Sequence, residues 1–294
     1  RVKHMNRRSF IQQSTGMLFV IPTIAAKPQP NYLNNIGIQL YSLRKPINEN
    51  LKQTVDEVAR MGYKQVEAYD FPSSKSLDMI KRAREKGMQV NSSHFQWDSL
   101  LNPDPKKLPS FEKVVELAHK NELTDLVVPY LHTHNRVDLE AYQKTAELLN
   151  RGAELSKEAG IRLAYHNHAF EFQPMLGGKT GYDVFIRSFS PDMFFELDVF
   201  WVKVGGVDPV SQIQYLENRI SQLHLKDLRS GFKCPNFGKV KPEDFVEIGD
   251  GQIPMNPILK AAGSAGVLHC HIEQDHSSSP LSSMEKSLLH LTMG

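Results

Sequence analysis

The chain has 294 residues, of which 35 are Lys or Arg and 33 are Asp or Glu, so its formal charge is +2. Hydrophobic residues make up 40% and charged residues 23%. These values are typical of a soluble enzyme and exclude a disordered, collagen-like or polytopic membrane chain. A net charge so close to zero provides no electrostatic surface for nucleic acid, so we expect no nucleic-acid partner.

The first thirty residues have the pattern of an export signal. Arg7 and Arg8 form a twin-arginine segment, and a mostly apolar stretch with a small-residue end follows at 17–26. This stretch is shorter than the ~20 residues that span a membrane. The sequence therefore predicts that residues 1–30 are a twin-arginine signal and linker, with a periplasmic location and no membrane anchor in the mature form. The alternative is an N-terminal helix that packs on the core.

From residue 36 onward, short apolar runs alternate with longer amphipathic runs. Expected strands are 36–41, 64–68, 88–93, 125–130, 161–166, 193–198, 220–225 and 267–272. Expected helices are 47–61, 76–86, 110–121, 138–159, 181–189, 209–217, 255–264 and 281–291. Several of these helices end at a glycine that a strand follows, which is typical of αβ units. Eight units in series predict an α/β fold, a single (β/α)8 TIM barrel over 31–294, with a doubly wound open sheet as the alternative.

The longest connection, 229–253, separates the last two expected strands. It follows the C-terminal end of a strand, which is where barrel enzymes build their active sites. We therefore expect Arg229, at its start, to contact the substrate. Aromatic residues also follow strands of the barrel, and we expect Trp201 among them to stack on a sugar, although packing at the rim explains such residues equally well.

Side chains on a barrel strand alternate between the helix layer and the interior. The inward parity carries acidic, imidazole and amine side chains near the ends of several strands: Glu67, His94, His166, His168, Glu196, Asp198, His224, Lys226 and Glu273. Buried carboxylates without a cation would be costly, and mixed O and N donors suit a divalent ion. The parity thus predicts one divalent metal ion, which could be Mn, Co, Mg, Fe or Zn.

Each of these residues also has a simpler interpretation. His166 alone is more often a hydrogen-bonded core histidine than a ligand. Glu273 could be a surface residue just past its strand. Lys226 could simply pair with Asp227 or Glu196. Asp198 and His224 are the hardest to explain without a functional site, because each lies on the inward parity at the end of an otherwise apolar strand.

Several segments resemble the xylose-isomerase-like TIM-barrel superfamily, often called sugar phosphate isomerases/epimerases. The first is the opening segment 36–44, Ile-Gly-Ile-Gln-Leu-Tyr-Ser-Leu-Arg, which contains Tyr41. The others are Tyr-His-Asn-His at 165–168, His-Leu-Lys-Asp at 224–227, Ile-Gly-Asp-Gly at 248–251 and Ile-Glu-Gln-Asp at 272–275. The resemblance covers about 36–290 and is strongest toward the inosose dehydratase-like branch.

The resemblance implies a metal held by Glu, Asp, His and Glu from the last four strands. Asp198, His224 and Glu273 match three of these ligands. The fifth strand departs from the pattern, so we take His166 as the fourth ligand, with His168 and Glu171 as fallback choices. A two-glutamate epimerisation, with one base on each face of the substrate, is therefore in doubt.

The predicted function is that of a metal-dependent isomerase, epimerase or carbon–oxygen lyase. It would abstract the α-proton next to the carbonyl of a keto-sugar, polyol or 3-keto-glycoside. Predicted catalytic residues are Glu273, Lys226, His94 and Glu67; predicted substrate contacts are His168, Arg229, Trp201 and Tyr41. The alternatives are a non-enzymatic periplasmic sugar-binding barrel and an endonuclease IV-like phosphodiesterase. The sequence leaves open the sugar, the metal and a homo-oligomer.

Overall fold

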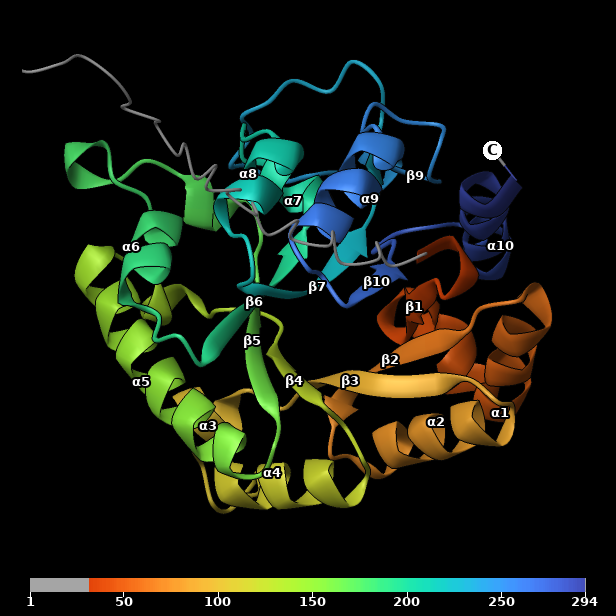
Figure 1. The fold of residues 1–294 in the computed structure, drawn as a ribbon, viewed down its shortest axis with the longest axis horizontal. Coiled ribbons are helices and arrows are strands. Elements are labelled where there is room, and N and C mark those ends of the chain that lie inside the picture. The colour runs from red at the N-terminus through yellow and green to blue at the C-terminus, as the bar shows by residue number, and fades with distance from the viewer. Residues whose placement is uncertain (1–31, 294) are drawn as a thin grey trace, which may run out of the picture.

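A computed structural model describes residues 32–293, and Figure 1 shows its strands enclosed by helices. Eight parallel strands close into a barrel in the order β1-β10-β7-β6-β5-β4-β3-β2. This confirms the predicted α/β fold with a single (β/α)8 TIM barrel and excludes the open sheet. The predicted export signal lies outside the described residues. Among the residues described, no helix combines the length and the apolar character needed to cross a membrane.

The barrel strands are β1 (Gly37–Gln39), β2 (Gln65–Phe71), β3 (Gln89–Phe95), β4 (Asp125–Val128), β5 (Arg162–His166), β6 (Met193–Asp198), β7 (Ile220–Leu225) and β10 (His269–Ile272). The helices are α1 (Arg44–Met61), α2 (Ser74–Glu85), α3 (Asp98–Leu101), α4 (Phe111–Lys120), α5 (Leu139–Glu158), α6 (Gly181–Ser188), α7 (Val199–Val204), α8 (Pro209–Tyr215), α9 (Met255–Ser264) and α10 (Pro280–Met293). The short helices α3 and α7 were not among the predicted elements.

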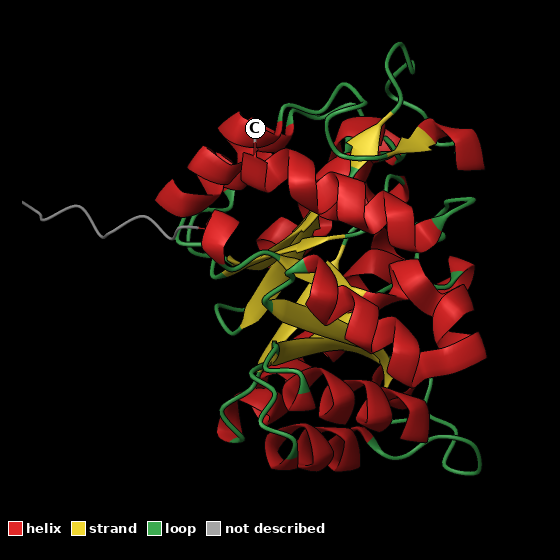
Figure 2. Ribbon diagram, turned by 90° about the vertical axis from the view of Figure 1, so that its right-hand side faces the viewer, coloured by secondary structure: helices red, strands yellow, loops and turns green. Residues whose placement is uncertain are grey.

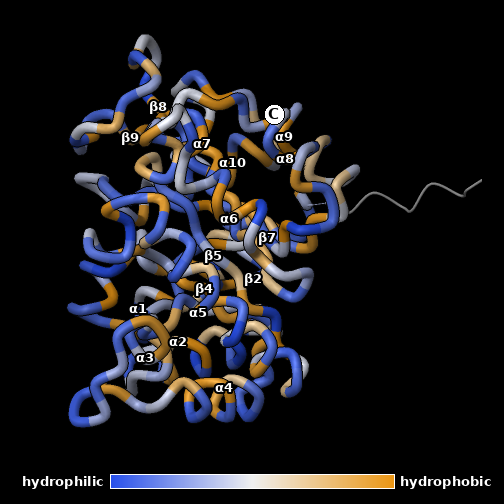
Figure 3. The backbone as a smooth tube through the Cα atoms, turned by 90° about the vertical axis from the view of Figure 1, so that its left-hand side faces the viewer, coloured by the Kyte–Doolittle hydropathy of each residue, from blue (hydrophilic) through white to orange (hydrophobic). Residues whose placement is uncertain are grey.

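Figure 2 shows the helices outside the strands. In α4 the buried residues are Phe111, Val114, Val115 and Ala118, which recur at helical spacing. Figure 3 shows the same alternation of apolar and polar residues along the helices. Several helices are capped at their N-termini by a side chain that accepts a backbone N–H, as Ser110 does for α4 and Asp138 for α5.

Two strands end earlier than predicted, for local reasons. The strand predicted at 36–41 ends at Gln39, because the Gln39 side chain accepts the Tyr41 N–H and turns the chain into a 3-10 helix over Leu40–Leu43. The strand predicted at 125–130 ends at Val128, directly before Pro129, which has no N–H for a ladder.

The barrel interior also explains Gly37, which opens β1. A Cβ atom at this position would lie 2.2 Å from Cδ2 of His271, a fully buried residue on the neighbouring β10. Only glycine leaves room for this imidazole beside β1. The glycine of the Ile-Gly-Ile-Gln segment therefore serves packing inside the barrel.

The long connection after β7 is organised by one buried carboxylate. It forms a small antiparallel ribbon of β8 (Asp227–Leu228) and β9 (Phe245–Val246), separate from the barrel sheet. Both Asp227 oxygens accept backbone N–H groups, at 2.8–3.0 Å, from Leu228, Gly249, Gly251 and Ile253. Four donors, three of them 22 to 26 residues away in sequence, thus converge on one side chain, which fixes the segment over the barrel.

We predict that Asp227→Ala destabilises the protein by about 3 kcal/mol, because it leaves several buried N–H groups without an acceptor. Urea unfolding measures this change as a shift of the midpoint. Glu243→Ala, an exposed change in the same segment, is the matched control and should leave the midpoint within about 0.5 kcal/mol of the parent. Equal effects of the two changes would contradict the role assigned to Asp227.

Candidate active site

Four inward side chains meet at the carboxyl ends of the last barrel strands. His166 Nε2 lies 3.2 Å from Asp198 Oδ2, and His224 Nδ1 lies 2.7 Å from Glu273 Oε2. One donor atom from each of the four residues lies within 4.8 Å of the others, and all four residues are buried. We call this set the outer group. It unites the four residues predicted as metal ligands, although their role as ligands stays a prediction.

Local hydrogen bonds explain how the ends of β5 and β6 position this group. Asp198 ends β6 and begins α7, and its Oδ1 accepts the Trp201 N–H at 2.9 Å. Its other oxygen, Oδ2, faces His166 and Lys226. Next to His166, the Asn167 side chain accepts the Asp198 N–H at 3.0 Å. The two strand ends are therefore held together by their backbones while His166 and Asp198 face each other.

Lys226 brings an ammonium group into the outer group. Its Nζ lies 2.9 Å from Asp198, 2.7 Å from Glu273 and 2.8 Å from Asp275. Burial alone would lower the pKa of Lys226, but the three carboxylates outweigh it and hold that pKa well above the usual range. The side chain therefore stays charged beside the four donors.

This arrangement corrects two of the simpler sequence interpretations. Lys226 pairs with neither Asp227 nor Glu196: Asp227 has the opposite parity and binds the β8–β9 segment, and the Lys226 ammonium is taken by Asp198, Glu273 and Asp275. Glu273 is not a surface residue, since only 4% of it is exposed.

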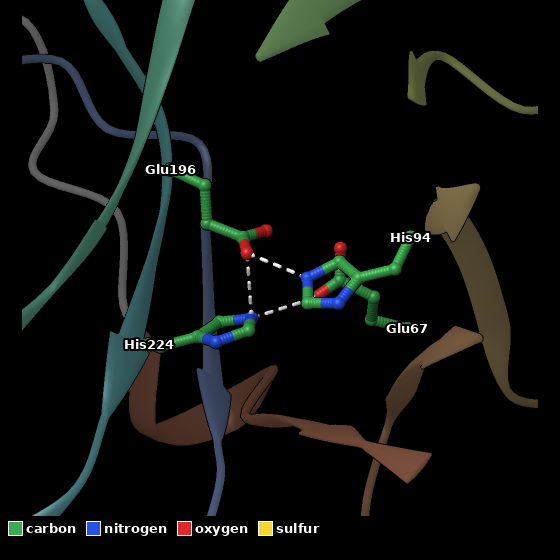
Figure 4. A group of neighbouring side chains, drawn as sticks. All are labelled: Glu67, His94, Glu196 and His224. Atoms are coloured by element: carbon green, nitrogen blue, oxygen red, sulfur yellow. Dashed lines mark hydrogen bonds and ion pairs between the residues drawn. The ribbon is translucent and has the colours of Figure 1, made fainter. Parts of the chain in front are cut away.

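Glu67, His94 and Glu196 lie beside the opposite ring nitrogen of His224. Figure 4 shows these side chains pointing toward one another. His224 Nε2 is 2.6 Å from Glu67 Oε2, and His94 Nε2 is 2.8 Å from Glu196 Oε1. Burial would lower the pKa of His224, but Glu196, Glu273 and Glu67 outweigh it and hold that pKa well above the usual range, so both ring nitrogens carry a proton. A cation in the outer group would displace the Nδ1 proton, and Glu67 would keep the one on Nε2. Glu67 thus orients His224 toward the outer group.

Two members of the outer group, His166 and Glu273, have the protonation states that suit a cation. Burial, together with the charges of His224 and Lys226, holds the pKa of His166 well below its usual range, so its Nε2 offers a lone pair. Burial would raise the pKa of Glu273, but Lys226 and His224 outweigh it and that pKa lies well below normal. A neutral imidazole and an ionised carboxylate are the forms that bind metals. The residues therefore fit one divalent ion.

The structure places the three candidates for the fourth metal ligand, His166, His168 and Glu171, in different surroundings. Glu171 is fully buried but bonds the Tyr165 hydroxyl, and its Oε2 accepts the His168 N–H at 2.8 Å. Tyr165 has the outward parity, so the Glu171 carboxylate is directed away from the outer group. The His168 ring lies 5.1 Å from that of His166, centroid to centroid, and stacks on Phe170. Of the three candidates, only His166 lies in the outer group.

A pocket of about 700 Å³ opens above the outer group. Its lining combines aromatic and polar side chains: Tyr41, Tyr69, Asp70, His94, Phe95, Gln96, Trp97, Asp98, Leu108, Pro129, Tyr130, His166, His168, Glu273 and Asp275. An apolar wall with a few convergent polar groups is the usual form of a small-molecule site. The volume accommodates a sugar ring with a further substituent.

The predicted substrate contacts divide into two pairs. Tyr41 and His168 line this pocket. Trp201 instead packs against the His168 ring at 5.1 Å, and Arg229 binds Asp244 with its Nη2 at 2.8 Å. Neither Trp201 nor Arg229 is among the lining residues, so any contact of theirs with a substrate stays a prediction.

Asp275 and Gln222 are components of the site that sequence reasoning missed. Asp275 lines the pocket and binds Lys226. The Gln222 amide donates to Glu67 Oε1 at 2.7 Å and also to Glu196. The inward parity of Gln222 was visible in the sequence, but a neutral amide gave no chemical signal. Asp275 lies beyond its strand, where parity no longer applies.

A closed barrel whose polar side chains gather at the carboxyl ends of its strands defines the class of TIM-barrel proteins that bind ligands at this end. A family model described as xylose isomerase-like TIM barrel matches residues 55–292. The chain belongs to this family, which confirms the resemblance seen in its sequence.

Individual relatives are more distant. The chain is 25% identical over 252 residues to an inosose dehydratase from Clostridium tetani, with 76% of this chain and 82% of the relative covered. Among solved structures, it is similar to a sugar phosphate isomerase/epimerase from Parabacteroides distasonis, with 24% identity, a TM-score of 0.71 and coverage of 92% of this chain and 97% of the other. An IolI protein with a bound zinc atom gives a TM-score of 0.66 at 14% identity, with 88% and 98% covered.

Glu171 generates a prediction about pH and stability. Burial raises its pKa from 4.5 to about 7. The folded state then binds more protons than the unfolded state between these values, so the stabilising contribution is lost as pH rises through this window. In Glu171→Gln the amide oxygen can accept the His168 N–H and the amide nitrogen can donate to Tyr165 Oη. We predict that this variant gains roughly 3 kcal/mol relative to the parent between pH 4.5 and 8.

Urea unfolding at a series of pH values measures this difference. Glu154→Gln, at an exposed position on α5, is the control and should follow the parent at every pH. A constant difference between Glu171→Gln and the parent would show that Glu171 has the same pKa in the folded and unfolded states, which contradicts the raised pKa.

Proposed function

We propose that the protein is a divalent-metal-dependent enzyme that removes the proton next to the carbonyl of a keto-sugar, polyol or 3-keto-glycoside, as an isomerase, epimerase or lyase. The observation that carries the proposal is the outer group, two imidazoles and two carboxylates with Lys226 beside them, under an aromatic-lined pocket. The family, and relatives described as dehydratases, isomerases and epimerases, support a sugar-modifying enzyme.

A cation bound to the outer group would act as a Lewis acid that stabilises negative charge on the substrate oxygens. Glu273 is the proposed base, because it is ionised and lines the pocket. Lys226 is the proposed acid, since its ammonium contacts Glu273 and can donate to an oxyanion or to a leaving hydroxyl. His94 lines the pocket and is the proposed contact for a substrate hydroxyl.

The fifth strand favours elimination or isomerisation over a symmetrical epimerisation. Where the family resemblance implies a glutamate, this chain has His166, and Glu171 bonds Tyr165 instead. A second carboxylate base on the opposite face of the substrate is therefore missing from the outer group. An ammonium beside the base suits loss of a hydroxyl or glycosyl oxygen, which needs a proton as it leaves.

We predict that the protein with Mn²⁺, Co²⁺ or Zn²⁺ catalyses exchange of the α-proton of a keto-sugar or 3-keto-glycoside with solvent deuterium. Lys226→Met should slow exchange and product formation by about 10²- to 10³-fold, and Asp198→Asn should abolish both. Proton NMR in deuterium oxide measures exchange, and mass spectrometry distinguishes elimination from isomerisation.

Lys179→Met, which changes an exposed lysine, is the matched control and should retain full activity. An Asp198→Asn variant with undiminished exchange would contradict the proposed site. Tight sugar binding without exchange in any metal form would favour the sugar-binding barrel instead, and cleavage of an abasic oligonucleotide would favour the phosphodiesterase.

We also propose that residues 1–30 direct the protein to the periplasm by the twin-arginine route, on the strength of Arg7, Arg8 and the apolar stretch that follows. A reporter fused to this segment should reach the periplasm, and changing both arginines to lysine should keep it in the cytoplasm. Unchanged export of the double variant would contradict this route.

A further inference from the structure

A second group of possible metal donors lies deeper in the barrel than the outer group. Glu67 and His94 come from β2 and β3, whereas Glu196 and His224 come from β6 and β7 on the opposite wall (Figure 4). We call Glu67, His94 and Glu196, with His224 at their side, the inner group. All four residues are buried, and one donor atom from each lies within 4.8 Å of the others.

The donor atoms of the inner group converge on one region. Glu196 Oε1 lies 2.8 Å from His94 Nε2 and 3.1 Å from His224 Nε2. Glu67 Oε2 lies 2.6 Å from His224 Nε2 and 3.9 Å from His94 Nε2. Two carboxylate oxygens and His94 Nε2 thus surround a common space, with the protonated His224 Nε2 at its edge. Carboxylate oxygens and imidazole nitrogens are donors that zinc and similar ions bind.

The other oxygens of both carboxylates are held by a neutral side chain. The Gln222 Nε2 donates to Glu67 Oε1 at 2.7 Å and to Glu196 Oε2. These bonds direct Glu67 Oε2 and Glu196 Oε1 toward the imidazoles. A bond from an outer side chain that orients a ligand in this way is a regular feature of metal sites.

The two carboxylates also lack a permanent positive partner. Within residues 32–293, every ion pair recorded for Glu67 and Glu196 is with a histidine, whereas Lys226 pairs with Asp198, Glu273 and Asp275. Buried charges are costly unless paired or bound to a metal. His271, fully buried beside His224, adds an imidazole with neither nitrogen hydrogen-bonded.

We propose that Glu67, His94 and Glu196 hold a second divalent cation, of the Zn²⁺ or Co²⁺ class, inside the barrel. His224 serves both groups without conflict: its Nδ1 faces the outer group, and its Nε2 proton is donated to Glu67 Oε2. A carboxylate oxygen can accept this proton and bind a cation as well. The inner cation goes beyond the proposed function, which requires only the outer group.

The test is metal stoichiometry of the full chain, stripped with a chelator and then titrated with Zn²⁺ or Co²⁺. Equilibrium dialysis with elemental analysis should find two equivalents in the parent, one in Glu196→Gln, one in His94→Gln and one in Asp198→Asn. The visible absorption of bound Co²⁺ should lose one component in the two inner-group variants and a different one in Asp198→Asn. Gln222→Ala should weaken the inner equivalent by about 10- to 100-fold.

The equivalent that Glu196→Gln retains shows that its barrel is folded. His132→Ala is the control for binding at the rim, where His132 lies 3.0 Å from Asp98, and it should still bind two equivalents. A parent that binds one equivalent, kept by Glu196→Gln and His94→Gln but lost in Asp198→Asn, overturns the inner cation and leaves the proposed function intact. One equivalent lost only in the inner-group variants supports the inner cation and contradicts the outer group as the metal site.

Discussion

The neutralisation of buried carboxylates is the constraint on which this site depends. Glu67, Glu196, Asp198 and Glu273 are all buried within one barrel, and in the region described Lys226 is the lysine or arginine that pairs with any of them. The remaining positive charge must come from imidazoles or from bound cations, because water is largely excluded. The need to neutralise these carboxylates explains why histidines of three strands, β3, β5 and β7, surround them. It also explains why a barrel with such an interior is suited to metal chemistry rather than to packing alone.

In Asp198 and His224, the two polar atoms of the side chain make different contacts. Asp198 begins α7 with one oxygen and faces His166 with the other. His224 has a carboxylate at each ring nitrogen. Because one atom of each residue is fixed by the fold, the direction of the other atom is set before any ligand arrives. Such preorganisation reduces the cost of ordering a site when substrate or metal binds.

The sequence predicted the eight strands and brought His166, Asp198, His224 and Glu273 to one end of the barrel, because strand alternation and chain order are local properties. The neighbours of each residue were not predictable, since Glu196 and Asp198 share a parity, and only the register of β6 with β5 and β7 pairs Glu196 with His166 and Asp198 with His224. The direction of the Glu171 carboxylate was not predictable either, because it depends on a hydrogen bond with the hydroxyl of the outward-facing Tyr165. The convergence of distant N–H groups on Asp227 likewise has no local signature.

Lys226 and Asp227 are neighbours in the chain but face opposite directions, Lys226 toward Glu273 and Asp227 toward the segment that ends near Ile253. Replacing that segment with another loop would remove the N–H groups that the Asp227 carboxylate accepts, and it would shift the adjacent ammonium of Lys226. Redesign aimed at substrate preference is therefore better directed to the opposite rim, where Trp97, Asp98 and Leu108 line the pocket. These residues are not adjacent in the chain to Lys226, the proposed acid.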